Sequence, residues 1–326
     1  GGEMNAGGPQ AGREMMPGRE MMEIFRGIES YPPDSPPSVV ALGVFDGVHL
    51  GHQRILATAT ERAHVLGLRA IACTFEPHPL QILQPERAPA PIMGIDDKLE
   101  ILGRHGLDAA AVISFTREFS QIEAERFAAD VLVGALKAKE VVVGFNHTFG
   151  RGARGTPALL EELGSRAGYA VHVIPPLSAN GIVVSSSVIR EALQAGDVGR
   201  ARLLLGRPYA ARSRVLRGSG RGRAIGFPTA NLNPDRELIL APGVYAGRAS
   251  WDEGSAGAVV NLGVRPTFGE GKLWLEAHLL DFSGDLYGRV LTLTFLARLR
   301  PERKFESVEA LRAQVAQDIV SARRFL

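Results

Sequence analysis

The stretch that decides the fold is Gly43-Val44-Phe45-Asp46-Gly47-Val48-His49-Leu50-Gly51-His52. It follows the apolar run 38–42 and precedes a segment with apolar residues at helical spacing, namely Ile55, Leu56, Ala59, Ala63 and Leu66. This pattern predicts a strand, a glycine-rich turn and a helix. His49 and His52 then fall at the helix start, where backbone N–H groups and the positive dipole end favour phosphate. The alternative is that both histidines are merely exposed on a turn.

The same alternation continues to about residue 190. Strands are predicted at 39–44, 69–75, 109–114, 140–144 and 170–174, and helices at 51–66, 96–105, 121–136 and 156–166. Strands and helices in this order indicate the α/β fold class, with a parallel sheet covered on both faces. Such a sheet binds ligands beyond the carboxyl ends of its strands.

Three further motifs follow predicted strands. They are Thr74-Phe75-Glu76-Pro77-His78-Pro79, the glycine-rich loop 144–152 with Asn146, and Ser185-Ser186-Ser187-Val188-Ile189-Arg190. The imidazole of the first and the loop of the second have either a structural or a binding role. The serines of the third either cap a helix or, with the arginine, hold a second phosphate. The histidine motif in the same α/β unit favours the phosphate interpretation.

The second half of the chain has a different pattern. From Gly206 onward, short alternating runs are separated by Gly, Pro, Asn and Asp, which predicts a small antiparallel barrel. Residues 192–205 are predicted to form a helical linker. Near the end, Ser307 can cap a helix that packs on the barrel with one apolar face, formed by Val308, Leu311, Val315 and Ile319.

Two stretches of this half carry candidate chemistry. Residues 218–231 combine a glycine- and arginine-rich segment with Phe227-Pro228-Thr229-Ala230-Asn231, which fits either a flap over phosphates or a basic hairpin without a ligand. The side-chain oxygens of Thr229 and Asn231 suit a hard cation such as magnesium. In the alternating run 273–280, Glu276 shares a strand face with Trp274 and His278. It is either a general base or a charge on the barrel surface.

Composition limits the classes of function. The 326 residues suffice for two domains, and 37 basic against 35 acidic residues make nucleic acid an unexpected partner. The single Cys73, in a predicted buried strand, indicates a reducing, cytoplasmic location. No apolar run reaches the roughly 18 residues that span a bilayer, and no Walker A motif occurs. Residues 1–30, with five of the six methionines, are expected to be a tail that is either disordered or in part added for expression.

Taken together, the motifs resemble one family. Over about residues 38–195 the chain resembles the adenylyltransferase half of bacterial bifunctional riboflavin kinase/FAD synthetases, through the motifs HxGH, TFEPHP, GFNxxFG and SSSxIR. The run from GRxxGFPTANL to LEAHLLDF and the last helix resembles their riboflavin kinase module, over about residues 206–326. This resemblance implies a Rossmann-like nucleotidyltransferase domain (FMN adenylyltransferase, 31–191), the linker, and a small antiparallel β-barrel riboflavin kinase domain with a C-terminal helix (206–326).

The resemblance also implies roles for single residues. In the first domain, those that bind ATP would be Gly43, Phe45, Asp46, His49, His52, Asn146, Ser186, Ser187 and Arg190, and those that line the flavin side would be Pro77, His78 and Pro79. In the second, ATP would be bound by Gly220, Gly222, Thr229 and Asn231, the last two also holding magnesium. The catalytic residues would be His49, His52 and Glu276, the glutamate accepting the proton of the riboflavin 5′-hydroxyl. Ser187 and Asn146-His147 depart from the family, which usually has Thr and often Asp-Phe there.

The implied function is two reactions on one chain. ATP phosphorylates riboflavin to FMN in the barrel, and a second ATP adenylylates FMN to FAD and pyrophosphate in the first domain. The expected partners are these small molecules, with no nucleic acid or membrane, and a transient homo-oligomer is left open. Two alternatives remain: a kinase whose adenylyltransferase is impaired near His147, and a flavin- or nucleotide-binding regulatory module that also binds RNA.

Overall fold

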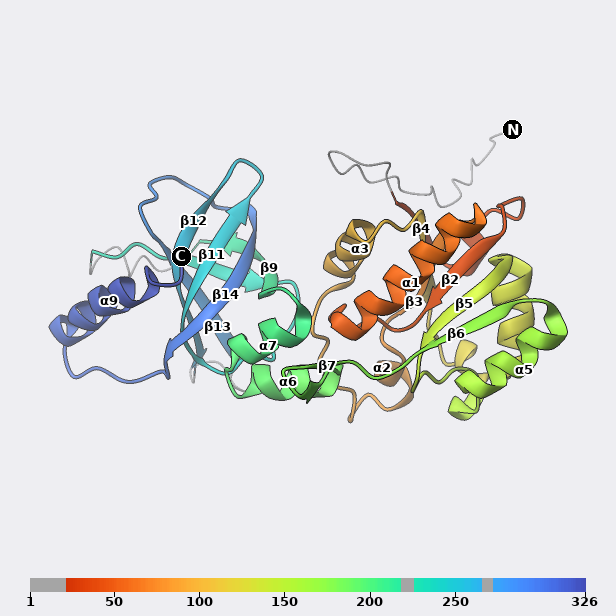
Figure 1. Ribbon diagram of the computed structural model, residues 1–326. Helices are drawn as coiled ribbons and strands as arrows, with labels where there is room; N and C mark the ends of the chain where they lie inside the picture. The colour runs from red at the N-terminus through yellow and green to blue at the C-terminus, as the bar shows by residue number, and fades with distance from the viewer. Residues whose placement is uncertain (1–21, 218–225, 266–271) are drawn as a thin grey trace, which may run out of the picture. The chain divides into compact units, whose positions relative to one another are not determined.

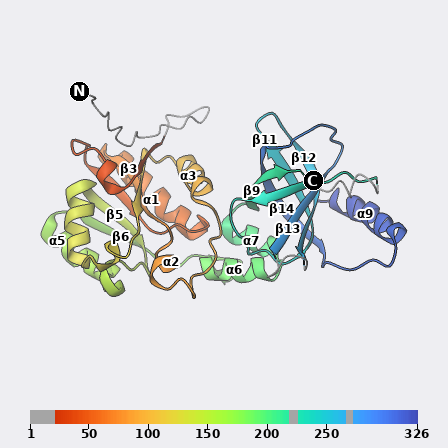
Figure 2. The ribbon, with the colours of Figure 1, turned by 180° about the vertical axis from the view of Figure 1, so that it is seen from behind.

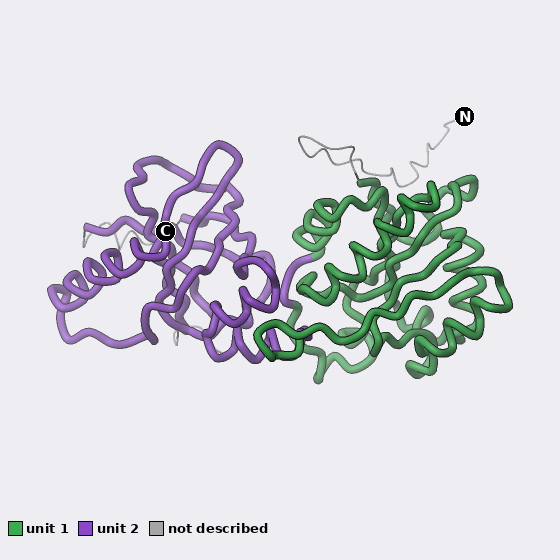
Figure 3. The backbone as a smooth tube through the Cα atoms, viewed as in Figure 1, with its two compact units in different colours: residues 1–91, 95–183 green, residues 92–94, 184–326 purple. Residues whose placement is uncertain are grey.

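Two compact units make up the chain (Figure 3). The computed structural model describes residues 22–217, 226–265 and 272–326. The first unit consists of 1–91 and 95–183, and the second of 92–94 and 184–326. The second unit therefore includes a short insertion from the first half of the chain.

The first unit contains a parallel sheet with the strand order β1-β4-β3-β2-β5-β6. Its strands are β1 (Glu23–Arg26), β2 (Ser38–Leu42), β3 (Arg69–Glu76), β4 (Ala109–Ser114), β5 (Ala138–Gly144) and β6 (Ala170–Ile174). The five predicted strands are confirmed to within two residues. The expected tail over 1–30 is wrong from Glu23 onward, because β1 pairs with β4 and the 3-10 turn η1 (Ile28–Ser30) follows it. Residues 1–21 lie outside the described part of the chain.

Helices cover both faces of this sheet (Figures 1 and 2). One face carries α1 (Leu50–Leu66) and α3 (Ile95–Arg104), and the other carries η3 (Phe127–Ala135) and α5 (Pro157–Ala167). The helix expected over 121–136 begins at α4 (Ala124–Arg126) and continues as η3, which is a π-helix. In it the Leu136 N–H donates to the Val131 carbonyl, five residues earlier, at 2.9 Å. Shorter elements are α2 (Pro79–Leu83), η2 (Phe119–Gln121), η4 (Arg151–Ala153), β7 (Ser178–Ala179) and β8 (Ile182–Val183).

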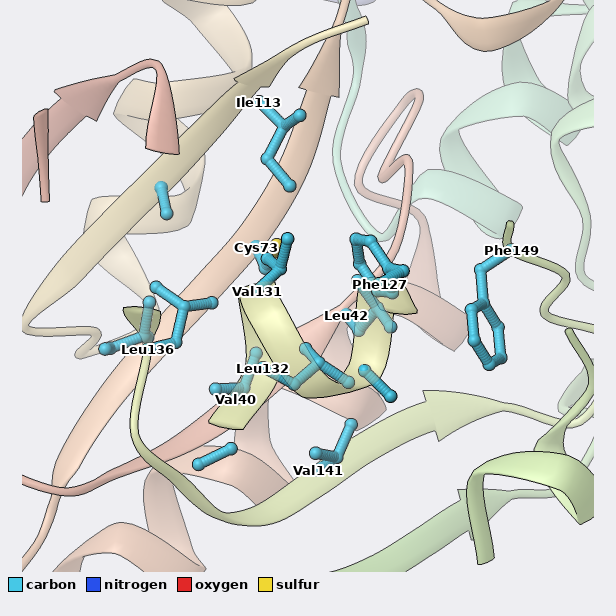
Figure 4. Close-up of a cluster of buried hydrophobic side chains, with 14 of the residues drawn as sticks. Val40, Leu42, Cys73, Ile113, Phe127, Val131, Leu132, Leu136, Val141 and Phe149 are labelled. Atoms are coloured by element: carbon cyan, nitrogen blue, oxygen red, sulfur yellow. The ribbon is translucent and has the colours of Figure 1, made fainter. Parts of the chain in front are cut away.

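The core between the sheet and the π-helix is apolar and buried (Figure 4). Alternate residues of β2, such as Val40 and Leu42, meet Phe127 and Leu132 of the π-helix. Cys73 lies in the same cluster, and burial raises the pKa of its thiol to about 12. The thiol therefore stays protonated and acts as a small apolar group, which agrees with the prediction of a buried strand.

The second unit begins with α6 (Ser186–Gln194) and α7 (Val198–Leu205), followed by a closed barrel. Its antiparallel strands are β9 (Tyr209–Leu216), β10 (Ala230–Pro234), β11 (Gly243–Trp251), β12 (Gly254–Arg265), β13 (Lys272–Leu279) and β14 (Val290–Arg300), in the closed order β10-β13-β12-β11-β14-β9. The predicted fold class, a parallel α/β domain followed by an antiparallel barrel with a C-terminal helix, is confirmed.

The final helix, α9 (Val308–Ala322), packs on the barrel as expected. The hydroxyl of Ser307 accepts a hydrogen bond from the Ala310 N–H at 3.1 Å and caps it. Ile319 lies against an apolar cluster of barrel residues, but Val308 is 54% exposed and does not belong to the packed face. No helix in the described ranges is long and apolar enough to cross a membrane.

Candidate active sites

The sheet of the first unit has a switch point between β2 and β5. From β2 the chain moves through β3 and β4 on one side, and later through β5 and β6 on the other. The Gly43–His52 turn follows β2, and the 144–152 loop follows the neighbouring β5. Ligands bind at such a point in open α/β sheets because the two loops diverge and leave a crevice. The two motifs therefore leave the sheet from adjacent strands.

His49 and His52 lie against each other at the start of α1. His49 is the N-cap residue, and its Nδ1 accepts a hydrogen bond from the His52 N–H at 3.3 Å. The two rings stack with centroids 3.5 Å apart and an interplanar angle of 16°. Since Nδ1 is an acceptor, the proton of a neutral His49 ring lies on Nε2. The histidines are thus not the loosely exposed pair of the alternative interpretation: His49 is only 7% exposed.

The backbone of this turn has an unusual conformation. Phe45 and Val48 have φ values of 54° and 41°, although both side chains are fully buried. Left-handed φ values at non-glycine residues cost about 1–3 kcal/mol and persist only where the surroundings impose them. The Phe45 ring lies edge-on to His52 at 5.4 Å, and a Cβ on Gly43 would come within 2.8 Å of that ring. The turn therefore holds the histidines through a packed aromatic ring.

A buried lysine, which the sequence analysis did not single out, forms a hydrogen bond to the backbone of the turn. Lys98 of α3 is 4% exposed, and its Nζ donates to the Val44 carbonyl at 2.9 Å. The Thr74 hydroxyl donates to the same oxygen, also at 2.9 Å. Burial lowers the pKa of Lys98, and the carboxylates of Asp46 and Glu76 oppose part of that shift. Asp46, predicted to contact ATP, is itself buried at 5% exposure.

The residues predicted for the flavin side follow β3. The peptide bond between Glu76 and Pro77 is cis, and Pro79 is the first residue of α2. His78 is the N-cap of that helix, and its Nδ1 accepts a hydrogen bond from the Leu80 N–H at 3.1 Å. This bond gives His78 a structural role, whether or not it also contacts a ligand.

In the loop after β5, two consecutive residues, Asn146 and His147, differ in how far solvent reaches them. Asn146 is exposed, whereas the neighbouring His147 packs parallel to Phe149, with ring centroids 6.1 Å apart. His147 as a whole residue is half-buried, but its Nε2 atom is inaccessible to solvent. Burial lowers the pKa of His147 to about 4, so the ring is neutral near pH 7. At this departure from the family pattern, His147 adds no charge to the loop.

Ser185 through Arg190 form the start of α6, which belongs to the second unit. The Ser185 hydroxyl accepts a hydrogen bond from the Val188 N–H at 3.3 Å, which is the capping role. Ser186 and Ser187 are then the first two residues of the helix, and Arg190 follows one turn later. Their joint action with the histidines stays a prediction.

On the barrel, three polar residues lie side by side on adjacent strands. Glu276 of β13 is directly opposite Asn231 of β10 and Asn261 of β12. Opposed residues of antiparallel strands share a face, with Cβ atoms about 4.5–5.5 Å apart. Leu275 and Ala277 point into the barrel and are fully buried, which places the three polar side chains on its outer face. The shared strand face predicted for Glu276 is therefore confirmed, and Asn261 joins it.

The carboxamides beside Glu276 each have a buried oxygen. Asn231 is 6% exposed, and the side-chain oxygens of both Asn231 and Asn261 are buried without a hydrogen-bond partner among the described residues. A buried amide oxygen without a partner is costly, and a bound cation or donor removes that cost. Thr229 is half-buried just before β10. Gly220 and Gly222, predicted to close over ATP, lie outside the described residues.

A pocket of about 300 Å³ begins two residues after Glu276. It is lined by β13 and the following turn together with α9, with His278, Leu280, Asp281, Phe282, Ile319 and Arg323 among its residues. Asp281 and Arg323 form a two-bonded ion pair at 2.8 and 2.9 Å that joins the turn to α9. The helix α9 thereby contributes one wall of a cavity that begins at the end of β13, the strand that carries Glu276.

A parallel α/β unit with a histidine turn at its switch point, followed by an antiparallel barrel, fits a two-domain transferase. Comparison with protein families agrees: FAD synthetase matches residues 31–188, and riboflavin kinase matches residues 205–326. The chain belongs to the family of bifunctional riboflavin kinase/FMN adenylyltransferases.

The relatives match nearly the whole chain. The bifunctional riboflavin kinase/FMN adenylyltransferase of Pseudomonas fluorescens is 38% identical, over 93% of this chain and 97% of the relative. That of Escherichia coli K12 is 36% identical over 93% and 98%, and that of Bacillus subtilis is 36% identical over 88% and 92%. A solved structure described as a macrolide-efflux protein from Streptococcus pneumoniae has a TM-score of 0.85 and 31% identity, over 93% of this chain and 99% of that one.

Proposed function

We propose that this chain makes FAD from riboflavin in two steps, each in its own site. The barrel transfers the γ-phosphoryl group of ATP to riboflavin, giving FMN and ADP. The parallel-sheet domain transfers the adenylyl group of a second ATP to FMN, giving FAD and pyrophosphate. The observation that carries the proposal is the presence of both sets of polar residues, the stacked histidines and the Asn231–Glu276–Asn261 row, in a chain of this family. The domain limits we assign are 31–191 and 206–326.

In the kinase step, Glu276 acts as general base. The 5′-hydroxyl of riboflavin attacks the γ-phosphorus, the bond to the ADP oxygen breaks, and the hydroxyl proton passes to the Glu276 carboxylate. The pocket bounded by Asp281 and Arg323 would take the flavin ring, and its lining begins at His278, two residues beyond Glu276 on β13. The protein then contributes mostly by positioning, since phosphoryl transfer needs little covalent chemistry from the enzyme.

The residues beside Glu276 fit a magnesium ion. Carboxamide and hydroxyl oxygens are the hard ligands that this ion prefers, and the Asn231 oxygen is buried without a partner among the described residues. Thr229 and Asn231 would hold the ion together with phosphate oxygens of ATP. When bound, magnesium would neutralise charge on the phosphates. Asn261, on the other side of Glu276, would orient the carboxylate or the nucleotide.

In the adenylyl step, the histidines stabilise charge. A phosphate oxygen of FMN attacks the α-phosphorus of ATP, and pyrophosphate leaves. His49 carries its proton on Nε2 when neutral, since Nδ1 accepts from the His52 N–H, so Nε2 can donate to a phosphate oxygen. The stack at 3.5 Å fixes both rings together. Ser186, Ser187 and Arg190 would hold the remaining phosphates, and Asn146 would lie near the nucleotide.

A substitution at Glu276 tests the assignment of the two reactions. Glu276→Gln keeps the size of the side chain and removes the base, so FMN formation should fall about 10²–10⁴-fold. Adenylylation of supplied FMN should remain within twofold of the unsubstituted protein. Glu309→Gln, on an exposed acidic residue of α9, is the matched control. Unchanged FMN formation in Glu276→Gln would remove the glutamate from the mechanism.

We propose that both reactions take place in the cytoplasm, which the single, buried Cys73 supports, and that nucleic acid is not a partner. The nearly equal numbers of basic and acidic residues support the second point. Sedimentation with and without ATP and flavin would test whether copies associate during turnover.

A further inference from the structure

His278 continues the pairing of β10 and β13 beyond the end of the ladder. The register pairs Leu232 with Leu275, Asn231 with Glu276, and Ala230 with Ala277. One step further, Thr229 would lie opposite His278, but β10 begins only at Ala230. The segment before β10 is therefore held at this point by something other than backbone pairing.

The His278 side chain supplies that attachment. Its Nδ1 lies 2.7 Å from the Pro228 carbonyl oxygen, and because a carbonyl only accepts, Nδ1 carries the proton and donates. The bonded carbonyl belongs to the peptide group whose nitrogen is that of Thr229. The Phe227 ring also meets the His278 ring edge-on, with centroids 5.7 Å apart. One imidazole thus contacts the two residues that precede Thr229.

Proline makes this single bond decisive. Pro228 has a fixed φ and no N–H group, so it cannot join the ladder through its nitrogen. Its carbonyl is the remaining backbone group with which it can bond to β13. Loss of the His278 bond would remove a restraint on the orientation of the Pro228–Thr229 peptide plane. The direction of the Thr229 hydroxyl would turn with it.

His278 also shares a face with the proposed base. Residues two apart on a strand point to the same side, so Glu276 and His278 both lie on the outer face of β13. We propose that His278 is a positioning residue of the kinase site, which fixes the Thr229 hydroxyl relative to the Glu276 carboxylate. It does not touch the reacting atoms. This inference rests on the proposed kinase function of the barrel.

Three substitutions test the hydrogen bond itself. His278→Asn places an amide N–H close to the position of Nδ1 and should keep the bond. His278→Phe keeps a ring against Phe227 but has no donor, and His278→Gln carries its donor one carbon further out. We expect kcat/KM for magnesium-ATP in FMN formation to fall about tenfold in His278→Phe and His278→Gln. His278→Asn should stay within about threefold of the unsubstituted protein.

Measuring kcat and KM separately distinguishes a positioning role of His278 from a loss of folded protein. If His278 orients Thr229, the KM for magnesium-ATP rises in His278→Phe and His278→Gln but not in His278→Asn. Because His278 also lines the pocket proposed for the flavin, the KM for magnesium-ATP is the deciding constant. A merely structural role would lower kcat through loss of active enzyme and leave the KM for magnesium-ATP unchanged. Adenylylation of supplied FMN by the same samples measures the intact chain. Should His278→Phe fail to fold, the pair His278→Asn and His278→Gln still gives the comparison.

Two results would overturn the inference. One is an unchanged KM for magnesium-ATP in both His278→Phe and His278→Gln. The other is an equal loss in His278→Asn and His278→Gln. If the unsubstituted protein makes no FMN at all, the proposed kinase function fails instead, so the two failures are distinguishable.

Discussion

Replacing Lys98 with methionine should separate catalysis from stability in the first unit. Methionine has a similar length and fits a buried site. It removes the ammonium group with its hydrogen bond to the Val44 carbonyl, and it also removes the positive charge that faces the carboxylates of Asp46 and Glu76. The carbonyl is not left without a donor, because the Thr74 hydroxyl remains at 2.9 Å. The substitution therefore removes one of two supports from the turn that carries His49 and His52.

The expected magnitudes differ for the two properties. A hydrogen bond from a charged donor contributes about 1.5–3 kcal/mol. Burying an ammonium group costs several kcal/mol, and the lowered pKa of Lys98 reflects that cost. Losing the hydrogen bond destabilises the fold, whereas no longer burying an ammonium group stabilises it. Because the two contributions oppose each other, the free energy of unfolding should differ from that of the unsubstituted protein by only about 1 kcal/mol. In catalysis the loss of turn geometry and of the positive charge beside Asp46 both count, and about 1.4 kcal/mol from the two together lowers the rate tenfold.

The assay is FAD formation from supplied FMN and ATP, with FMN formation from riboflavin as the internal control. We expect Lys98→Met to lower adenylylation at least tenfold, with unchanged kinase activity and a thermal midpoint within about 3 °C. Lys139→Met, at an exposed lysine of the same unit, is the matched control and should change neither. Full adenylylation activity in Lys98→Met would refute the reasoning. A parallel loss of both activities would instead indicate unfolding.

Three further substitutions test other parts of the account. His52→Ala should lower FAD formation from FMN at least 10²-fold and leave FMN formation intact; equal loss of both in a folded protein would contradict it. Asn261→Ala should raise the KM for magnesium-ATP in the kinase assay, and an unchanged value would remove Asn261 from the site. Glu140→Gln should lower the free energy of unfolding by about 1–2 kcal/mol at pH 7, since it weakens the bonds from Arg62 at 2.6 and 2.7 Å, and Arg62 is partly screened by solvent. The Arg62 hydrogen bond holds the pKa of Glu140 below its ordinary value, so this stabilisation is present above about pH 4.3 and disappears as the pH falls through the folded pKa. Urea unfolding at a series of pH values from 7 downward checks this: the difference between the two proteins should shrink as the pH falls below about 4.3, and a difference that stays the same at every pH would contradict it.

The strands of the parallel sheet could be predicted because burial on both faces makes them continuous apolar runs. Val40 and Val141 are examples, each fully buried. The short edge strand β1 could not, since its four residues follow a methionine-rich stretch and pair only with β4. The π-helix also escaped prediction, because an apolar segment such as Phe127–Ala135 has no sequence signal that separates a five-residue hydrogen-bond spacing from the usual four.

The candidate sites show the same division. His49, His52 and Glu276 belong to local motifs that can be recognised along the chain. Lys98 and Asn261 acquire their places only through tertiary packing and strand register: a lysine after two aspartates looks like a surface charge, and Asn261 meets Glu276 only once β12 and β13 are aligned.

The most direct test of the central claim, two ATP-dependent sites on one chain, is a chromatographic time course. Purified protein is mixed with riboflavin, ATP and magnesium, and each sample is resolved for riboflavin, FMN, FAD, ADP and pyrophosphate. The account predicts that FMN rises and then gives way to FAD, with one ADP formed for each riboflavin consumed and one pyrophosphate for each FAD. FMN that accumulates without FAD, or no flavin product at all, would contradict it.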